Sequence, residues 1–375
     1  MKNTVLIIGA GWAGVTVAEM LQRSGVSSEI IEGSNKIGGH SRSEKINGVI
    51  YEPNGPHIFH TSNPKVNNFV TSFGMTRKFK HEVKTRIYPV SLGGESILVS
   101  WPPQVDELKQ LAEWQSIENE LNALPKVINQ NNFETYAISI MGPTLYSLFI
   151  EGYTLKQWGT EAKNLSSEFA PKRIDLRKDG NKALFNDVWE YFHPGGSGEI
   201  IEKIAKNKSI TFDTKMDINS LLEVEKIYDF IVITAPLDDF LNTENSLPWR
   251  GIKSVPEIYS EDTVTEAYQI NHPSLAEEYT RTVETKHASG QEVEGTIVCK
   301  EYSFPNIRHY PILTKDGDSK NKNIQLKSQI SNMFNPDKVE FCGRLANYQY
   351  INQDQAIEQG FETADKIIEK IKSNS

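Results

Sequence analysis

The chain lacks most of the features that mark secreted, membrane or metal-dependent proteins. Only two of its 375 residues are cysteines, Cys299 and Cys342, and their separation matches neither a metal motif nor a disulfide framework. No apolar run approaches the roughly 20 residues of a transmembrane helix. The first strand-like run begins at Thr4, without the basic and apolar regions of a signal peptide. We therefore expect a cytoplasmic protein with reduced, buried thiols and no membrane span.

Basic charge is also scarce. Lys and Arg total 40 against 49 Asp and Glu, which gives a net charge of −9, and no basic block occurs. This balance argues against nucleic acid and anionic membranes as general partners, so a phosphate site requires a local group of arginines. The sequence shows no internal repeat, and no Ser/His/Asp, HExxH or cysteine-rich motif supports hydrolytic or metal chemistry.

The N-terminal stretch contains the pattern on which the fold prediction rests. An apolar run at 4–8 predicts a buried parallel strand, and Gly9, Gly11 and Gly14 follow it as G-x-G-x-x-G. Helical spacing comes next, and a second strand ends at Glu32. In a dinucleotide-binding unit the glycines allow a tight turn, close approach to a pyrophosphate and helix–strand packing, while the acid accepts ribose hydrogen bonds. The alternative is a glycine-rich turn that serves packing alone.

The residues after this unit favour FAD over NAD. Asn35-Lys36-Ile37-Gly38-Gly39-His40 resembles the second glycine pair of FAD enzymes in the glutathione-reductase-like superfamily, where the chain returns across the cofactor. A nicotinamide dehydrogenase would usually continue into another crossover helix here. The cofactor contacts predicted in this part of the chain are Gly9, Gly11, Trp12, Ala13, Gly14, Glu32, Gly38, Gly39, His40 and Ser41.

The predicted fold class is α/β, with a Rossmann-like FAD-binding domain, an inserted helical subdomain and an antiparallel β-sheet domain. A buried strand at 228–236 returns to the cofactor sheet, residues 104–165 carry helical spacing, and residues 255–305 alternate as antiparallel strands. We assign 1–77, 195–245 and 335–375 to the FAD-binding domain, 104–165 to the helical subdomain, and 78–103, 166–194 and 246–334 to the sheet and substrate domain.

Several downstream side chains are candidates for the site, and each has a structural alternative. Histidines near an aromatic, such as His57 and His60, are often packed and hydrogen-bonded rather than catalytic. Tyr153 and Trp158 fit a core or an interface as well as a pocket, and an isolated arginine is usually solvated or ion-paired. The full set is His57, His60, Tyr153, Trp158, Arg173, Arg177, Arg281, Arg344, Tyr348 and Tyr350.

Six strings spread over the chain change this balance: GPHIFHTSN at 55–63, GYTLKQWG at 152–159, PKRIDLR at 171–177, PLDDF at 236–240, YTRTVETKH at 279–287 and CGRLANYQYINQDQAI at 342–357. Together with the N-terminal fingerprint they resemble, in the same order, the UDP-galactopyranose mutase family. Members of this family are flavoenzymes that interconvert pyranose and furanose nucleotide sugars. GPHIFHT and GYTxKQW are the specific motifs, because generic FAD binding explains neither.

The resemblance implies a redox-neutral isomerase reaction. In the family, N5 of the reduced flavin attacks the anomeric carbon and expels the nucleoside diphosphate; the ring of the N5–sugar adduct opens and recloses, and the diphosphate returns. The protein must then orient the sugar and stabilise the diphosphate, a task for which arginine is suited. The resemblance also implies NAD(P)H as the external reductant, a homodimer, and a role in forming galactofuranose for cell-surface polysaccharide.

The resemblance assigns roles to individual residues. Arg177 matches a mobile-loop arginine that closes on the diphosphate, and Arg281 matches the fixed arginine on its other side. His57 and His60 match positions beside the flavin ring. The implied substrate contacts are Phe149, Tyr153, Trp158, Arg177, Arg281, Tyr310, Arg344 and Tyr350, and the further implied cofactor contacts are His57, Gly343, Arg344 and Gln353.

The chain departs from the family pattern around the nucleotide and sugar. Trp101-Pro102-Pro103-Gln104 stands where the family has an L-P-I-N-L-type string, and the loop around Arg177 lacks the usual tyrosine-rich run. Ile351 replaces a second tyrosine, and Asn347 replaces an acid. The substrate is therefore open between UDP-galactose and a sister nucleotide sugar with another hexose, an N-acetylated sugar or a 6-deoxy sugar.

Two other functions compete with the mutase. An FAD-dependent oxidoreductase of the amine-oxidase-like group would share the fold and the Pro194-Gly195-Gly196 segment, but it gives no reason for several arginines beside Trp158. A catalytically silent protein that binds FAD or a nucleotide sugar is the third possibility.

Overall fold

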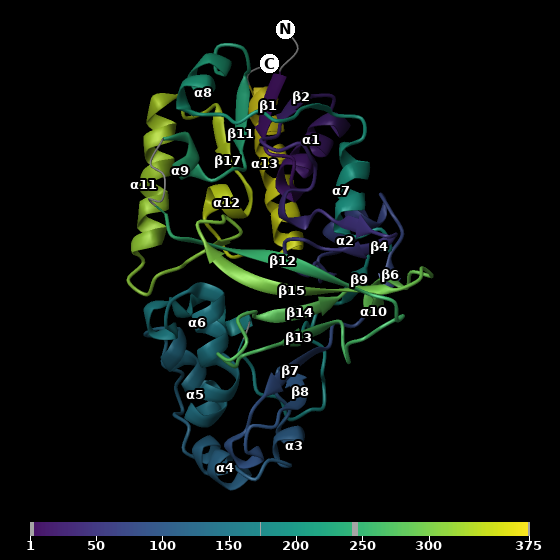
Figure 1. Ribbon diagram of the computed structural model, residues 1–375. Coiled ribbons are helices and arrows are strands. Elements are labelled where there is room, and N and C mark those ends of the chain that lie inside the picture. The colour runs from purple at the N-terminus through teal and green to yellow at the C-terminus, as the bar shows by residue number, and fades with distance from the viewer. Residues whose placement is uncertain (1–3, 173, 242–246, 374–375) are drawn as a thin grey trace.

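The computed structural model describes residues 4–172, 174–241 and 247–373, and it consists of three layers (Figure 1). A unit built on a parallel sheet contains both described chain ends, a long twisted sheet crosses the middle, and a group of helices lies below it. Among the described residues, no helix has the length and apolar character needed to cross a membrane.

The parallel sheet has the strand order β10-β2-β1-β11-β17. Its strands are β10 (Ser209–Thr211), β2 (Ser27–Ile31), β1 (Thr4–Ile8), β11 (Phe230–Ile233) and β17 (Val339–Phe341). Strand β1 pairs in parallel with β2 on one side and with β11 on the other. The strands come from the beginning, middle and end of the chain, so the segments that form the other two layers are inserted between the strands of this sheet.

Helices cover both faces of the parallel sheet because successive residues of β1 point to opposite sides. Val5 and Ile7 pack with residues of α1 (Trp12–Arg23), α2 (Pro64–Thr71), α7 (Ser197–Ala205) and α13 (Gln353–Ser373). Leu6 and Ile8 pack with residues of α8 (Ile218–Val224), α9 (Leu237–Phe240), α11 (Asp318–Met333) and α12 (Gly343–Asn347). The predicted α/β class with a Rossmann-like unit is confirmed.

The middle layer is a sheet of order β16-β12-β15-β14-β13-β7-β8, in which β13 and β7 run parallel and the other pairs run antiparallel. Its strands are β7 (Val83–Ile87), β8 (Ile97–Trp101), β12 (Trp249–Tyr259), β13 (Gln269–Asn271), β14 (Arg281–Glu284), β15 (Thr296–Pro305) and β16 (Tyr310–Pro311), and a short helix α10 (Lys286–Ser289) follows β14. Both surfaces of this sheet are covered near its centre, where β14 and β15 present charged residues.

The lower layer contains α3 (Val105–Leu108), α4 (Trp114–Asn122), α5 (Phe133–Tyr146) and α6 (Gly152–Trp158), and one π-helical stretch, Ser147–Glu151, joins α5 to α6. Two small sheets complete the fold: β3 (Glu44–Ile46) with β4 (Val49–Tyr51), and β5 (Phe59–Thr61) with β9 (Trp189–Phe192) and β6 (Arg77–Lys78). Asn63 caps α2, because its side chain accepts the Lys65 N–H.

Two elements differ from the sequence prediction. Helix α11 lies in the range assigned to the sheet domain, yet its Leu326 and Ile330 pack against the parallel sheet. Strand β9 lies in the range 166–194 assigned to the sheet domain, where no individual strand was predicted, and its pairing with β5 brings residues 189–192 beside the GPHIFHT string. Neither segment carries a regular polar–apolar alternation long enough to reveal its partner.

Candidate active site

The turn after β1 and the first turn of α1 contain Gly9, Gly11 and Gly14, which together are called the glycine cradle. Gly9 has φ +110°, and a Cβ on Gly14 would stand 2.0 Å from the Gly9 carbonyl oxygen, so β1 and α1 could not pack as they do. Gly11 is different, because a Cβ there would meet nothing closer than the Gly39 Cα at 4.0 Å. Gly11 and Gly39 lie side by side, and both line a cavity of about 760 Å³.

This first cavity has the size and lining of a dinucleotide site. Its volume lies within the roughly 300–1,000 Å³ of ligand pockets, and the N-terminus of α1 opens onto it. The Glu32 carboxylate lies at the end of β2, where it accepts the Ala10 N–H at 2.8 Å and the Ser34 N–H at 2.9 Å. Of the predicted cofactor residues, those that line this cavity are Gly9, Gly11, Trp12, Ala13, Glu32, Gly38, Gly39, His40, Ser41, His57, Gly343, Arg344 and Gln353.

The C-terminal helices close the cavity from the other side. Gly343 starts α12 with φ +85°, and a Cβ on it would be 2.9 Å from the Ala13 Cβ, so this turn sits directly on α1. The Gln353 side-chain oxygen accepts the Trp12 indole N–H at 2.8 Å. These contacts lock the first turn of α13 against the glycine cradle, and the residues present therefore fit an FAD-sized cofactor.

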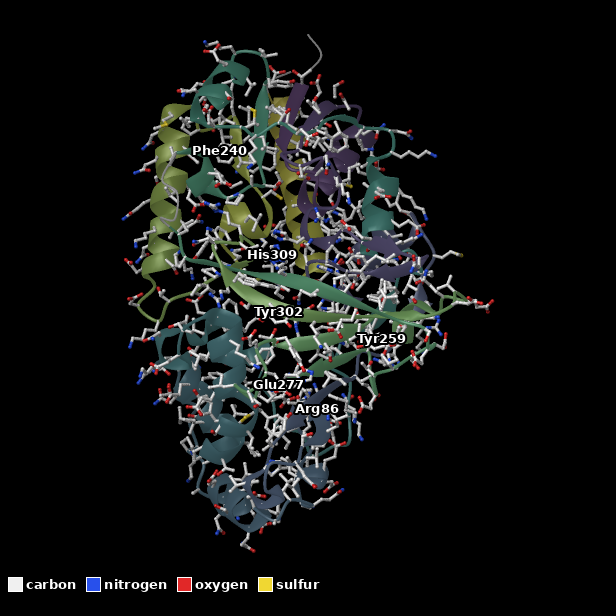
Figure 2. The ribbon with its side chains drawn as sticks, in the orientation of Figure 1. Arg86, Phe240, Tyr259, Glu277, Tyr302 and His309 are labelled. Atoms are coloured by element: carbon white, nitrogen blue, oxygen red, sulfur yellow. The ribbon has the colours of Figure 1, made fainter. Side chains whose placement is uncertain are left out.

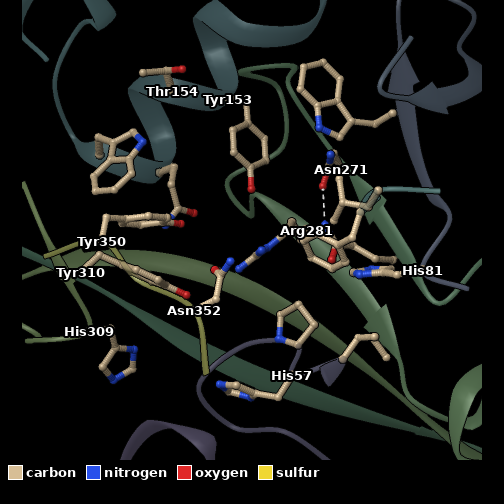
Figure 3. A pocket seen from close by; sticks show the side chains of 18 of the residues that line it. His57, His81, Tyr153, Thr154, Asn271, Arg281, His309, Tyr310, Tyr350 and Asn352 are labelled. Carbon is tan, nitrogen blue, oxygen red and sulfur yellow. Dashed lines mark hydrogen bonds between the residues drawn. The ribbon is translucent and has the colours of Figure 1, made fainter. Parts of the chain in front are cut away.

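A second cavity lies between the middle sheet and the helical layer, and Figure 3 shows its lining from close by. It meets the first cavity at a shared border made of His40, His57, Arg344, Asn352 and Gln353. His309 also lines the second cavity, and Figure 2 places it where the upper unit meets β12. A ligand in the second cavity would thus touch a cofactor in the first.

Arg281 at the start of β14 reaches into the centre of the second cavity (Figure 3). Its Nε and one terminal nitrogen each lie 2.6 Å from the same carboxylate oxygen of Glu301, a side chain with no exposed surface. Burial is the largest single influence and disfavours the charge of Arg281, but the carboxylate of Glu301 and three neighbouring tyrosines together raise the pKa of Arg281 above its ordinary value. Gly55, with φ +109°, lies beside this pair, because a Cβ added to it would stand 3.6 Å from a terminal nitrogen of Arg281 and 3.7 Å from Glu301. The arrangement holds a permanent cation in a largely desolvated place.

Aromatic rings line the wall beside Arg281. Tyr310 and Tyr350 stack with ring centroids 5.6 Å apart, and Trp158 lies 5.6 Å from Tyr350. The Arg344 guanidinium sits over both tyrosines, 5.2 Å from Tyr310 and 5.6 Å from Tyr350. Tyr153 contributes a hydroxyl from α6, and burial raises the pKa of Tyr153 to about 12. This wall offers flat apolar surface, hydroxyl donors and a second guanidinium, which suits a base and a phosphate.

The predicted substrate residues divide into two groups. The structure brings most of them together around the second cavity, namely Phe149, Tyr153, Trp158, Arg281, Tyr310, Arg344 and Tyr350, with His57 and His60. Arg177 lies apart, because its guanidinium binds Asp175 and the carbonyls of Asn181 and Ala183, and it lines an adjoining cavity instead. Arg173 lies outside the described residues.

Tyr348 was a candidate and is a core residue. It is 2% exposed, its ring packs on Trp249, and its hydroxyl donates to the carbonyls of Pro248 and Ile312. The prediction was wrong because the chain turns at Tyr348, where φ is +51°. The Tyr348 ring stays in the core, and Tyr350, two residues later, lines the second cavity.

The histidines of the site differ in their partners. His60 lies 2.7 Å from Asp187 through Nδ1 and stacks on Phe185 at 3.5 Å, so it is a packed and hydrogen-bonded histidine at the edge of the cavity. His57 is 13% exposed, and burial, helped by the charge of Arg344, lowers the pKa of His57 to about 3. His81 was not predicted; it lines the cavity, and burial lowers the pKa of His81 to about 3. All charge in the centre of the site therefore comes from arginine and carboxylate groups.

Three residues of the site gave no signal in the sequence. Glu301 is one position in an alternating strand, Glu52 precedes the GPHIFHT string, and His81 stands in a short connection between strands. A motif search finds residues that are adjacent in sequence, whereas Glu301 reaches Arg281 through the pairing of β15 with β14, and Glu52 and His81 lie in connections after β4 and before β7. Only the pairing of Arg281 with Glu301 across β14 and β15 could have been sought, as opposite charges on neighbouring strands.

Helix α6 is anchored beneath the site through Lys156. Its ammonium donates to four backbone carbonyls, those of His272 at 2.5 Å, Ser274 at 2.6 Å, Glu277 at 2.8 Å and Tyr279 at 2.9 Å. The same helix carries Tyr153 and Trp158 into the cavity. Lys156 therefore holds the loop between β13 and β14 against the helix that supplies the aromatic wall.

Replacing Lys156 with methionine is expected to destabilise the protein and to raise KM more than it lowers kcat. Four carbonyls lose a charged donor, and one such hydrogen bond is typically worth about 1.5–3 kcal/mol. Chemical denaturation and steady-state kinetics measure the two effects. Lys163→Met is the matched control, because Lys163 pairs with Glu161 at the surface of the same layer. Unchanged stability and KM in Lys156→Met would contradict the anchoring role.

Two family models match the chain. The model described as UDP-galactopyranose mutase matches residues 148–350, more than half of the chain, and includes α6, Arg281 and Tyr350. The model described as an NAD(P)-binding Rossmann-like domain matches residues 7–73, which include the glycine cradle. The first match thus covers the part of the chain that carries Arg281 and the aromatic wall, and the second covers the glycine cradle, although both parts contribute residues to both cavities.

Curated relatives match from end to end. A probable UDP-galactopyranose mutase of Klebsiella pneumoniae is 28% identical over 388 residues, covering 99% of this chain and 96% of the relative. A dTDP-fucopyranose mutase of Escherichia coli is also 28% identical, over 99% of this chain and 100% of the relative. These two relatives differ in both the nucleotide and the sugar that their names give.

Solved structures show the same fold at lower identity. A reduced UDP-galactopyranose mutase superposes with a TM-score of 0.76 at 16% identity, covering 98% of this chain and 95% of that chain. A putative protoporphyrinogen oxidase from Exiguobacterium gives a TM-score of 0.71 at 11% identity over 99% of both chains. The architecture is thus shared by mutases and oxidases, while the mutase model matches the part of the sequence that carries Trp158, Arg281 and Tyr350. The protein belongs to the UDP-galactopyranose mutase family.

Proposed function

We propose that the protein interconverts the pyranose and furanose forms of a nucleotide-diphosphate sugar with FAD as its cofactor. The observation that carries the proposal is the position of Arg281, a permanent, largely buried cation in the cavity that borders the cofactor site. A cation there has a use when a diphosphate leaves and returns, and it has no use in removing a hydride from an uncharged amine.

The first cavity would hold the cofactor through the glycine cradle, the N-terminus of α1, Glu32 and the Gly343–Arg344 turn. Reduced FAD bound there would supply the electron-rich nitrogen that attacks the anomeric carbon of the sugar. The protein's own part is to bring this carbon to the border of the two cavities. His40, His57 and Asn352 line that border and would orient the sugar.

The diphosphate would lie between Arg281 and Arg344. The planar fork of arginine donates two parallel hydrogen bonds to phosphate oxygens and remains charged as the leaving group gains charge. Glu301 fixes one edge of the Arg281 guanidinium, which leaves its other edge for the ligand. The hydroxyls of Tyr310 and Tyr350 are further donors in reach of the same space, and Trp158 offers a face for the base.

The segment around Arg177 would complete the site when the substrate binds. The second cavity measures about 230 Å³, which is less than the roughly 300–1,000 Å³ of ordinary ligand pockets. An adjoining cavity of about 740 Å³ shares His60, Ile174, Leu184, Phe185 and Asn352 with it and contains Arg177. A nucleotide sugar would need both spaces, so residues 174–187 must rearrange around it, and this movement would bring Arg177 to the diphosphate.

The test is a screen of nucleotide sugars against the dithionite-reduced protein, with pyranose and furanose products separated by chromatography. UDP-galactose and a dTDP-linked 6-deoxy sugar are the first two substrates, because both kinds of name occur among the relatives. We expect isomerisation without consumption of oxygen or NAD(P)⁺, and none with oxidised protein. Cyanoborohydride should capture labelled sugar on the flavin.

The competing function is an amine-oxidase-like oxidoreductase, since a putrescine oxidase shares the fold with a TM-score of 0.61 at 12% identity. Stoichiometric oxygen or NAD(P)⁺ consumption with an amine, and no isomerisation of any sugar, would support it. Binding of a nucleotide sugar with neither turnover nor capture would instead indicate a silent binding protein.

We also propose NAD(P)H as the external reductant, a homodimeric state and a cytoplasmic location, all of which rest on the family resemblance. Anaerobic bleaching of the flavin absorbance by NADPH or NADH tests the first, and sedimentation of the purified protein tests the second. A role in cell-surface polysaccharide synthesis would follow if the furanose product is a galactofuranose donor.

A further inference from the structure

Glu52 and His57 form an unusual pair behind the border of the two cavities. Glu52 is 2% exposed, and one of its carboxylate oxygens accepts the backbone N–H of His57 at 2.7 Å and the Tyr268 hydroxyl at 3.2 Å. Its other oxygen and the Nδ1 atom of the His57 ring are both buried, and neither has a hydrogen-bond partner in the described structure. These two unpartnered atoms lie 3.9 Å apart.

Two buried polar atoms without hydrogen-bond partners lower the stability of a protein, unless they share a proton or move close enough to form a hydrogen bond. A separation of 3.9 Å is too long for a hydrogen bond, but a side-chain movement of about 1 Å would form one. Catalytic hydrogen bonds are often long before the ligand binds. The two side chains are thus placed to share one proton.

We propose that Glu52 and His57 act as a proton relay that gives a proton to one sugar oxygen and takes it back from another during ring opening and closure. The proposal rests on the mutase function. His57 lines both cavities and would touch the sugar, whereas Glu52 is a positioning and proton-holding residue that acts through the imidazole.

The protonation states agree with this relay. Burial raises the pKa of Glu52 to about 8, and Glu301 adds to the increase, although the His57 N–H and the Tyr268 hydroxyl oppose it. His57 stays neutral at the same pH because burial lowers its pKa. Glu52 is therefore the acid and Nδ1 of His57 the acceptor near pH 7. The charged and titratable groups that face the pair are His40, Tyr268, Arg281, Cys299, Glu301, His309 and Arg344.

The proton balance closes without any outside reactant. When the bond between the anomeric carbon and the ring oxygen breaks, its electron pair stays on that oxygen, which takes a proton from the ring nitrogen of His57 that faces it. Nδ1 takes the Glu52 proton at the same time. On closure through another hydroxyl, that hydroxyl returns its proton to His57, and Nδ1 returns one to Glu52.

Glu52→Gln separates the relay from a structural role. Glutamine keeps the shape and the oxygen that accepts the His57 N–H, but it cannot release a proton. We expect kcat to fall by about 10²–10⁴-fold, the range for a general acid–base group, with KM little changed. The wild type should lose kcat as the pH rises through about 8, since Glu52 then ionises, and the variant should lose this limb. Wild-type kcat with the same basic limb in Glu52→Gln would overturn the proposal.

The matched control is Glu190→Gln. Glu190 is 6% exposed, accepts the backbone N–H of His81 at 2.6 Å and has a pKa raised by burial, but it lines neither cavity. We expect this variant to retain the wild-type pH profile. An equal loss of kcat in both variants would assign the effect of Glu52→Gln to lost packing and would overturn the relay.

Infrared titration gives a readout that needs no turnover. Between pH 6 and 7 the purified protein should show a protonated-carboxyl band that disappears above pH 8 and is missing in Glu52→Gln. A wild-type spectrum without such a band would overturn the proposal, even where the variant does not fold. If the band is present but no nucleotide sugar is isomerised, the proposed function fails while the protonated Glu52 stands.

Discussion

Replacing Arg281 with alanine is expected to lower kcat by about 10²–10³-fold while the protein still binds FAD. Removal of one preorganised donor for developing charge typically costs this much, about 2.7–4 kcal/mol, and Arg281 lines the second cavity but not the first. Steady-state kinetics of the reduced enzyme and the flavin absorbance of the purified variant measure the two halves of the prediction. Turnover close to wild type would remove Arg281 from the mechanism.

The structure adds a complication that the sequence did not show. Glu301 has no exposed surface, and Arg281 is its ion-pair partner. Alanine at position 281 leaves this carboxylate buried without a countercharge, which typically costs about 3–5 kcal/mol of stability. A loss of activity in Arg281→Ala alone could then reflect unfolding, so the single variant does not isolate the catalytic effect.

The double variant Arg281→Ala/Glu301→Gln separates the two effects. Neutral glutamine removes the unpaired charge, so the free energy of unfolding should recover most of the loss in Arg281→Ala, whereas kcat should not recover. Arg281→Lys provides a second control, because it keeps the charge but not the planar fork, and its kcat should fall between those of wild type and alanine. Recovery of kcat in the double variant would show that stability, not the diphosphate, explains the loss.

The two halves of the fold differ in how well the sequence predicts them. The glycine cradle was predicted residue by residue, because strand, turn, helix and second strand are contiguous and each glycine answers a local steric demand. The elements that complete the parallel sheet and the small sheet beside the GPHIFHT string were predicted less completely. Strands β10 and β9 and helix α11 are short or weakly periodic, and their places depend on partners more than a hundred residues away.

The site shows the same limit. Arg281, Trp158 and Tyr350 were found through motifs that resemble a known family, and the structure places them around one cavity. Glu52 and Glu301 were not found, although Glu301 pairs with Arg281 and Glu52 faces His57, because a buried carboxyl group is recognisable only by what surrounds it. Arg177 was found by motif, but its side chain binds its own loop here, since residue type cannot tell which conformation a segment adopts.

The second large effect is expected at the glycine cradle, where alanine at Gly11 should weaken FAD binding and alanine at Gly14 should lower stability. Gly11→Ala should leave the stability of the cofactor-free protein within about 1 kcal/mol of wild type, because Gly11 has ordinary φ and ψ and its Cβ would meet only the Gly39 Cα, at an ordinary contact distance of 4.0 Å. Gly11 also lines the first cavity, where an added methyl group would keep a phosphate away from the backbone N–H. The loss of one charge-assisted hydrogen bond, about 1.5–3 kcal/mol, weakens FAD binding by about 10–100-fold.

Gly14→Ala should lose stability first, and weaker FAD binding should follow from that loss. Its Cβ would lie 2.0 Å from the Gly9 carbonyl oxygen and 3.2 Å from Ile7, so the strand and helix must separate even without FAD. Overpacking of this kind typically costs about 1–3 kcal/mol, and flavin loss then follows from the displaced turn.

Denaturation of the cofactor-free proteins and titration with FAD distinguish the two positions, with Gly25→Ala as the control. Gly25 has φ +77° but no atom within 4 Å of an added Cβ, so alanine there pays backbone strain of about 1–3 kcal/mol and should bind FAD as the wild type does. Only Gly11→Ala is expected to lose cofactor affinity without losing stability. If Gly11→Ala unfolds as readily as Gly14→Ala, the division of roles between the two glycines is wrong. If Gly11→Ala is stable but binds FAD normally, the first cavity does not hold the pyrophosphate at this turn.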